Sequence, residues 1–150
     1  MTRISLISAT ALLALCSTEA QAEPPEGTAV TGFGGFFFRA EDPAALAEWY
    51  KGNLGIDKTP TSYDIEPWTQ DAGYTVFAPF PSGSTEFAPE GKSFVLNFRT
   101  DDLDGLVEHL RAHEVEVTVD EQLYPNGRFA SLSDPEGNPI QLWEPQDPDE

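Results

Sequence analysis

The chain has 150 residues, of which 39% are apolar and 11% aromatic, which is enough for the core of one ordinary domain and too apolar for a disordered chain. Its 26 acidic residues outnumber eight Lys and Arg, so the formal net charge is −18 at neutral pH. Because such a surface repels phosphate backbones, the charge excludes nucleic acid as a partner.

Residues 1–22 have the order of features of a secretory signal peptide. Arg3 supplies a positive charge, an apolar run covers residues 4–15, and Ala20-Gln21-Ala22 is a small-residue cleavage site. About 12 residues at ~1.5 Å each are shorter than the ~30 Å core of a bilayer, so no stable membrane anchor is expected. Cys16, the chain's one cysteine, leaves with this segment, so the mature chain has no disulfide. We expect cleavage near Ala22 and a periplasmic or secreted bacterial protein.

The mature chain begins with a polar arm over residues 23–29 and a glycine-interrupted strand over 30–40. Asp42 and Pro43 then begin a helix that runs to about Asn53, because Asp is a good N-cap and proline fits the first turn. Leu54-Gly55 ends this helix.

A second strand and helix follow with the same spacing. Residues 94–100 are strand-like, Asp101 or Asp102 caps a helix that runs to about His113, and another strand begins at 115–119. A shift of 60 residues aligns Phe38 with Phe98, Arg39 with Arg99, Asp42 with Asp102, Leu46 with Leu106, Tyr50 with Leu110 and Lys51 with Arg111. This repeat predicts two copies of a βαβββ module rather than a solenoid, which needs at least three repeats.

Residues 134–138, Asp-Pro-Glu-Gly-Asn, have the composition of a tight turn in which Gly137 takes the left-handed conformation. The turn places residues 140–143 on the last strand. With a period of two, Gln141 and Trp143 lie on one face of that strand, and Ile140 and Leu142 lie on the other. An acidic tail follows at 146–150.

Several of these segments together resemble the vicinal oxygen chelate (VOC) superfamily of glyoxalases, bleomycin-resistance proteins and extradiol dioxygenases, and its glyoxalase-like branch in particular. They are residues 34–43, Trp49-Tyr50 and 53–56 in the first half, and residues 127–130 and 134–145 in the second. The resemblance covers residues 30–145. It implies an α+β fold in which two βαβββ modules, about 30–90 and 91–145, pair into a half-open barrel around a cavity.

Enzymes of this superfamily mostly hold one divalent metal ion through His, Glu or Gln side chains of the first and last strands of each module. The resemblance puts these four positions at Gly35, Thr75, Val95 and Gln141. Only Gln141 is a plausible ligand, and one amide oxygen does not hold a divalent ion against water. We therefore expect no metal cofactor, and a divalent metal remains the less favoured alternative.

His109 and His113 lie four residues apart on the second predicted helix, like half of a zinc site. No glutamate lies between them, and the apolar stripe of the helix leaves His109 on the opposite side. We expect a solvated pair.

The strand faces that the resemblance implies put a group of aromatic, amide and arginine side chains in the cavity. The expected cavity residues are Phe37, Arg39, Asn97, Arg99, Arg128, Gln141 and Trp143. Aromatic walls with few polar groups are typical of a small-molecule pocket. Two alternatives stay open: Trp143 covers the barrel as part of the core, and Arg39 and Arg99 bind nearby acidic helix caps rather than a ligand.

The sequence thus predicts an exported glyoxalase-like VOC-domain protein that binds a small, partly aromatic or amphipathic molecule without a metal. The alternative is a metal-dependent lyase, isomerase or dioxygenase with a rebuilt ligand set, and a weaker third is a partner-binding module with a filled barrel. Whether the chain is an enzyme and whether it forms a homodimer both stay open.

Overall fold

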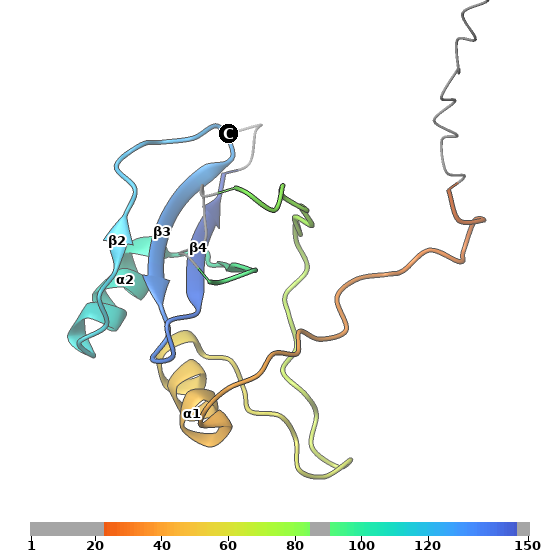
Figure 1. The fold of residues 1–150 in the computed structure, drawn as a ribbon, viewed down its shortest axis with the longest axis horizontal. Helices are drawn as coiled ribbons and strands as arrows, with labels where there is room; N and C mark the ends of the chain where they lie inside the picture. The colour runs from red at the N-terminus through yellow and green to blue at the C-terminus, as the bar shows by residue number, and fades with distance from the viewer. Residues whose placement is uncertain (1–22, 85–90, 147–150) are drawn as a thin grey trace, which may run out of the picture. The chain divides into compact units, whose positions relative to one another are not determined.

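The computed structural model describes residues 23–84 and 91–146 (Figure 1). The predicted signal peptide, residues 1–22, and residues 147–150 of the predicted tail lie outside the described residues. The chain divides into two units, one ending at Phe37 and one beginning at Phe38. In the described ranges, no helix combines the length and the apolarity that a membrane crossing requires.

None of residues 30–40, which span the boundary of the two units, belongs to a strand, so the strand predicted there is wrong. Three of these positions, 32, 34 and 35, are glycines. Glycine weakens a strand because it offers no side chain for packing and loses more backbone entropy on ordering than other residues.

The second unit begins with helix α1 (Pro43–Leu54), whose predicted bounds are confirmed. The carboxylate of Asp42 accepts a hydrogen bond from the backbone N–H of Ala45 at 3.1 Å, as an N-cap does. Gly55 ends the helix with φ at 68°, a left-handed conformation that glycine adopts without strain.

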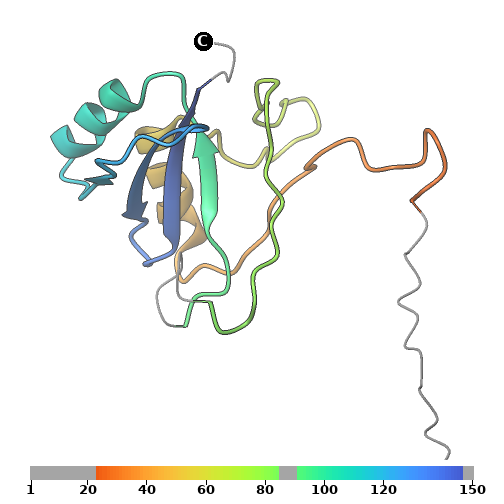
Figure 2. The same cartoon turned by 90° about the horizontal axis from the view of Figure 1, so that it is seen from above.

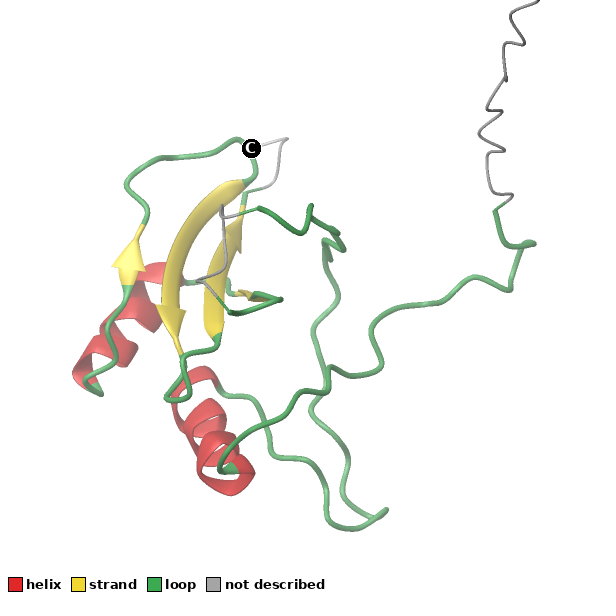
Figure 3. Cartoon of the chain, in the orientation of Figure 1, coloured by secondary structure: helices red, strands yellow, loops and turns green. Residues whose placement is uncertain are grey.

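Residues 55–84 and 91–95 contain no helix or strand (Figure 3). Prolines at 60, 67, 79 and 81 interrupt this stretch, and proline cannot donate to a strand ladder. The first half of the chain therefore has one regular element in its described residues where the repeat predicts a βαβββ module.

The second half has the predicted βαβββ order. It consists of β1 (Leu96–Arg99), α2 (Leu103–Ala112), β2 (Thr118–Val119), β3 (Gly127–Ser133) and β4 (Pro139–Pro145). The four strands form one curved sheet in the order β1-β4-β3-β2, in which β1 is parallel to β4 and the other neighbours are antiparallel (Figures 1 and 2). The fold is therefore α+β, as predicted.

The predicted turn at 134–138 joins β3 to β4. Gly137 has φ at 73°, and its N–H donates to the backbone oxygen of Asp134 at 2.9 Å. This turn fixes the register of β3 against β4, in which Leu132 lies opposite Ile140 and Ser131 opposite Gln141.

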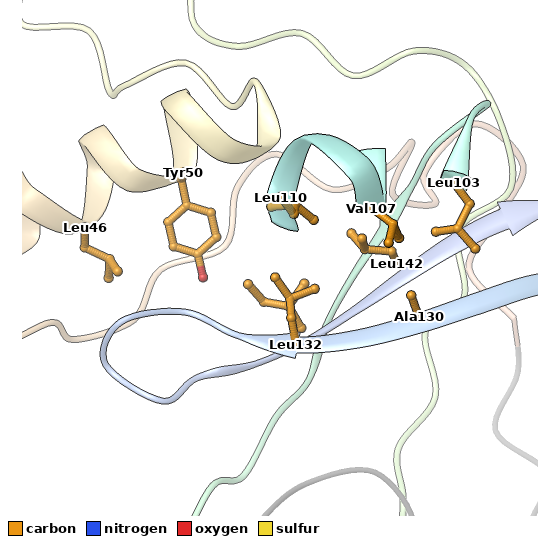
Figure 4. Packing of buried hydrophobic residues seen from close by; sticks show 9 residues of the cluster. Leu46, Tyr50, Leu103, Val107, Leu110, Ala130, Leu132 and Leu142 are labelled. Carbon is orange, nitrogen blue, oxygen red and sulfur yellow. The ribbon is translucent and has the colours of Figure 1, made fainter. Parts of the chain in front are cut away.

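Both helices cover the same face of the sheet, and the core lies between (Figure 4). The buried core residues are Leu46, Tyr50, Leu103, Val107, Leu110, Ala130, Leu132, Ile140 and Leu142. Leu96 and Phe98 of β1 pack against this cluster. The prediction that Ile140 and Leu142 share one face of the last strand is confirmed, and this face is the one that the helices cover.

Candidate functional site

The side chains that alternate with the core residues lie on the other face of the sheet, here called the open face. Its residues are Asn97 and Arg99 of β1, Gln141 and Trp143 of β4, Phe129 and Ser131 of β3, and Thr118 of β2. The strand register arranges them in two rows. One row runs across all four strands and is polar, and the neighbouring row combines an arginine with two aromatic residues.

The polar row is Asn97, Gln141, Ser131 and Thr118, each opposite the next in the register. The amide nitrogen of Asn97 donates to the side-chain oxygen of Gln141 at 2.7 Å. Since this bond uses one lone pair of the Gln141 oxygen, Gln141 can offer a ligand its amide N–H groups and the second lone pair.

The aromatic row is built around Trp143. Its ring is stacked on Phe129, with centroids 6.2 Å apart and planes 7° from parallel, and the ring of Tyr124 packs edge-on against Phe129 with centroids 5.5 Å apart. Trp143 is only 7% exposed, and its indole N–H donates to the backbone oxygen of Asn126 at 2.7 Å. Trp143 is thus a buried, fixed part of the open face, while Phe129 and Tyr124 are half-buried.

Gly127 makes this packing possible. Its φ is 127°, and a Cβ at this position would lie 2.0 Å from the backbone oxygen of Glu144 and 2.9 Å from the indole nitrogen of Trp143. Only glycine therefore fits beside Trp143.

A groove of about 400 Å³ lies on the open face toward β2. It is lined by Thr118, Val119, Asp120, Glu121, Phe129, Ala130, Ser131 and Gln141. Thr118, Asp120, Glu121 and Ser131 are exposed, so the groove is open to solvent. Its two charged lining residues are carboxylates, and none of its lining residues is a lysine or arginine.

Asp120 is held in place at the edge of this groove. One oxygen of its carboxylate accepts the backbone N–H of Gln122 at 3.0 Å, and the other accepts the hydroxyl of Tyr124, also at 3.0 Å. This hydrogen bond to Asp120 raises the pKa of Tyr124 above its ordinary value, because the carboxylate favours the neutral phenol that donates to it.

Among the predicted cavity residues, Gln141 lines the groove, Asn97 is bonded to it, and Trp143 lies on the same face. Arg99 is on that face too, but its guanidinium donates to the backbone oxygens of Asp71 at 2.8 Å and Ala72 at 3.3 Å. Arg99 therefore ties the loop before β1 to the strand, rather than contacting the acidic helix caps that the sequence suggested.

Arg128 lies on the helix side of β3 and not on the open face. Its guanidinium donates to both carboxylate oxygens of Asp104 on α2, at 2.6 and 3.0 Å, and to Glu144 at 3.2 Å. Asp104 accordingly raises the pKa of Arg128, and Arg128 lowers the pKa of Asp104. Because Glu144 also accepts the backbone N–H of Leu103 at 2.9 Å, this ion pair fastens α2 to the sheet.

The remaining two predicted residues lie elsewhere. Phe37 belongs to the first unit and is 92% exposed, and Arg39 is exposed just before α1. Of the positions that the resemblance assigned to metal ligands, Gln141 lies on the open face, while Val95 directly precedes β1. In the part of the chain that the structure describes, no three His, Cys, Asp or Glu side chains are grouped to hold a metal ion.

Sequence reasoning missed several groove residues. Phe129 and Ser131 alternate with the core residues Ala130 and Leu132, so the period of β3 would have placed them on the open face. Asp120 and Glu121 follow a strand of two residues, and no local pattern indicates that they reach the groove.

A family model described as Glyoxalase/Bleomycin resistance protein/Dioxygenase superfamily matches residues 32–142. The Escherichia coli (strain K12) protein YaeR, described as uncharacterized, is 40% identical over 50 residues, which are 33% of this chain and 39% of YaeR. The match thus spans about two-fifths of that relative.

Two solved structures from Streptomyces sp. CB03234 are also similar to this chain. A glyoxalase/bleomycin resistance protein is 40% identical, with a TM-score of 0.31, over 35% of this chain and 46% of its own. The antibiotic binding protein TnmS3 is 25% identical, with a TM-score of 0.40, over 67% of this chain and 84% of its own. The family assignment rests on the sequence match over residues 32–142.

Proposed function

Because the chain belongs to the Glyoxalase/Bleomycin resistance protein/Dioxygenase superfamily, we propose that it binds a small molecule in the groove of the open face without the help of a metal ion. The groove carries this proposal. Its volume of about 400 Å³ suits a small ligand, and it joins an aromatic side chain, Phe129, to the polar groups of Thr118, Ser131 and Gln141. A partly aromatic, amphipathic molecule matches this lining.

The charges around the groove favour a ligand whose polar end is cationic. Asp120 and Glu121 are the charged groups of its lining, and both are carboxylates. Arg99 and Arg128 donate to acceptors of the protein itself, so they do not favour an anionic ligand. The net charge of −18 also draws cations toward the surface. We therefore propose an aromatic or alkyl amine as the ligand class.

A pair of matched probes tests this proposal. We expect 2-phenylethylamine to bind more tightly than 3-phenylpropionate, which carries a similar aromatic end and the opposite charge. Phe129→Ala and Gln141→Ala should each weaken amine binding about tenfold, the effect of losing about 1.4 kcal/mol of contact. Calorimetric titration and NMR shift mapping on the chelator-treated protein measure both effects.

Glu108→Gln on α2 is the matched control, because it removes one charge from an exposed residue that does not line the groove. It should leave amine binding within about twofold of the unsubstituted protein. Equal binding of both probes, or unchanged binding in the Phe129 and Gln141 variants, would contradict the proposal. Native mass spectrometry of purified protein addresses the alternative, because a stoichiometric metal ion required for ligand binding would support the metal-dependent enzyme.

The proposal also includes export, which rests on the order of charge, apolar run and Ala20-Gln21-Ala22 in residues 1–22. The exported protein should begin at Glu23. Intact-mass measurement of material from the periplasm or medium tests this, and a mass that includes the leader or a lipid on Cys16 would contradict it.

A further inference from the structure

A pair of histidines lies near the end of α2. His109 and His113 are the chain's two histidines, both are exposed, and their ring centroids are 4.3 Å apart with the planes tilted by 45°. They belong to the helix side of the sheet and line no part of the groove. An exposed pair at this spacing can be two solvated side chains. Whether the pair can bind an ion depends on which ring nitrogens have a free lone pair.

Each ring has one nitrogen beside a backbone carbonyl. Nε2 of His109 lies 3.1 Å from the oxygen of Gly52 in α1, and Nδ1 of His113 lies 2.7 Å from the oxygen of His109. A carbonyl oxygen only accepts, so these two nitrogens carry hydrogen. In the neutral rings, Nδ1 of His109 and Nε2 of His113 then have the lone pairs. Histidines that bind metal ions are held in this way, with the second ring nitrogen donating to a carbonyl or carboxylate.

The separation of the rings also fits a shared ion. A metal ion ~2.0 Å from a ring nitrogen lies about 3.2 Å from the ring centre. Two rings that bind one ion with a nitrogen–metal–nitrogen angle of about 90° therefore have centres about 4.5 Å apart. The observed 4.3 Å is close to this value.

The charged residues that flank the pair in sequence are mostly acidic, which favours a cation. Glu108 and Glu114 flank the pair in sequence, and Glu116 follows. Arg111, the basic residue between the histidines, donates its guanidinium to the backbone oxygen of Val117 at 3.1 Å. We propose that His109 and His113 form a two-histidine site for a divalent transition-metal ion, with Cu²⁺ bound most tightly because imidazole sites follow the Irving–Williams order. This site is independent of the groove and its ligand.

Titration of the chelator-treated full chain with Cu²⁺ tests the site. We expect one equivalent to bind with an electron paramagnetic resonance spectrum that shows coupling to two imidazole nitrogens. His109→Gln and His113→Gln should each weaken this binding at least tenfold. Glu108→Gln, which removes a neighbouring charge and no ligand, should change it by less than about threefold.

Imidazole NMR signals give a second readout that does not depend on the variants. Because the chain has two histidines, substoichiometric Cu²⁺ should broaden both ring signals together. Broadening of one ring alone, or copper bound with both ring signals unchanged, would overturn the proposal, as would equal affinity of the His113→Gln variant. The copper experiments do not depend on amine binding in the groove, so a failure of the proposed function would leave their results unchanged.

Discussion

Asp134 is the most heavily bonded buried side chain of the turn between β3 and β4. It is 4% exposed, and its carboxylate accepts the backbone N–H groups of Glu136 at 2.9 Å and Asn138 at 2.8 Å. It also accepts the side-chain amide of Asn138 at 2.7 Å and the hydroxyl of Tyr50 at 2.9 Å. One carboxylate thus orders the turn and ties it to α1.

Replacing Asp134 should therefore destabilise the protein strongly. Asp134→Ala leaves several buried donors without an acceptor, and we expect a loss of roughly 3 kcal/mol in the free energy of unfolding. Tyr50→Phe removes a single hydrogen bond and should cost about 1 kcal/mol. Urea unfolding of both variants measures the difference. Equal losses in the free energy of unfolding for the two variants would show that Asp134 stabilises the protein through its bond to Tyr50 and not through its bonds within the turn.

Tyr50 also predicts a dependence of stability on pH. Burial raises the pKa of its hydroxyl, and the bond to Asp134 raises it further. Above the ordinary tyrosine pKa of about 10, the unfolded chain releases this proton while the folded protein keeps it, so folding stability falls as pH rises. We expect urea midpoints to drop between about pH 10 and 11, and Tyr50→Phe should drop less. Parallel curves for the two proteins would refute this assignment.

At the scale of elements, the side chain of Arg99 on β1 holds the loop that precedes this strand, and the guanidinium lies beside Gly73 of that loop. Arg99 donates to the backbone oxygens of Asp71 and Ala72, and a Cβ at position 73 would lie 1.5 Å from its Nη1. Gly73→Ala should displace the guanidinium and free the loop, at a cost in stability below about 1 kcal/mol because the end of the arginine can move.

Limited chymotrypsin digestion measures this effect, since Tyr74 and Phe77 lie in the freed segment. Gly73→Ala and Arg99→Ala should both be cut several times faster there than the unsubstituted protein. Gly83→Ala is the matched control, because a Cβ at that glycine meets nothing within 4 Å. Identical digestion of all three variants would show that Arg99 does not restrain the loop.

The two faces of β4 should also respond differently to truncation. Leu142 is fully buried in the core, so Leu142→Ala should cost roughly 2–5 kcal/mol. Gln141 is half-buried on the open face, and Gln141→Ala should cost about 1 kcal/mol or less while it weakens ligand binding. Thermal melts and amine titrations on the same variants test the contrast. A loss for Gln141→Ala as large as that for Leu142→Ala would mean that the open face is a filled core.

The elements that the sequence predicted correctly are those with local signals. Asp42, Gly55 and Asp102 fix the helix ends through contacts within a few residues, and the turn at 134–138 is equally local. The segment 30–40 has the apolar residues of a strand, but a strand also depends on a neighbour distant in the chain. Its three glycines weaken that pairing in a way that periodicity alone does not reveal.

The part of the site that lies on strands could be predicted, because side chains alternate between the two faces of a strand. The resemblance, together with a period of two along each strand, placed Gln141 and Asn97 on one face, and the register brings them together. The same period on β3 puts Arg128 with Ala130 and Leu132 on the helix side, where it meets Asp104. The partners of Arg99 and the carboxylates of the groove come from loops, and their positions depend on tertiary packing rather than on sequence spacing.

At the scale of the whole molecule, the net charge of −18 means that the acidic side chains of one folded chain repel one another, which destabilises the folded state. The screening length falls from ~30 Å at 0.01 M salt to ~3 Å at 1 M, so added NaCl weakens repulsion between distant carboxylates. It also screens ion pairs such as Arg128 with Asp104, but a partly exposed pair contributes at most about 1 kcal/mol. Repulsion among many acids should outweigh that loss.

We therefore expect the melting temperature to rise by roughly 4 °C between 0.01 and 1 M NaCl, the shift that corresponds to about 1 kcal/mol in a domain of this size. A variant with Glu108, Glu114 and Glu116 changed to Gln separates repulsion from other effects of salt, because it removes three exposed acids that lie near one another in sequence, within and just after α2. This variant should melt higher than the unsubstituted protein at low salt and should gain less from NaCl. A melting temperature that falls with salt, together with a less stable variant, would mean that ion pairs rather than self-repulsion dominate the electrostatics of the fold.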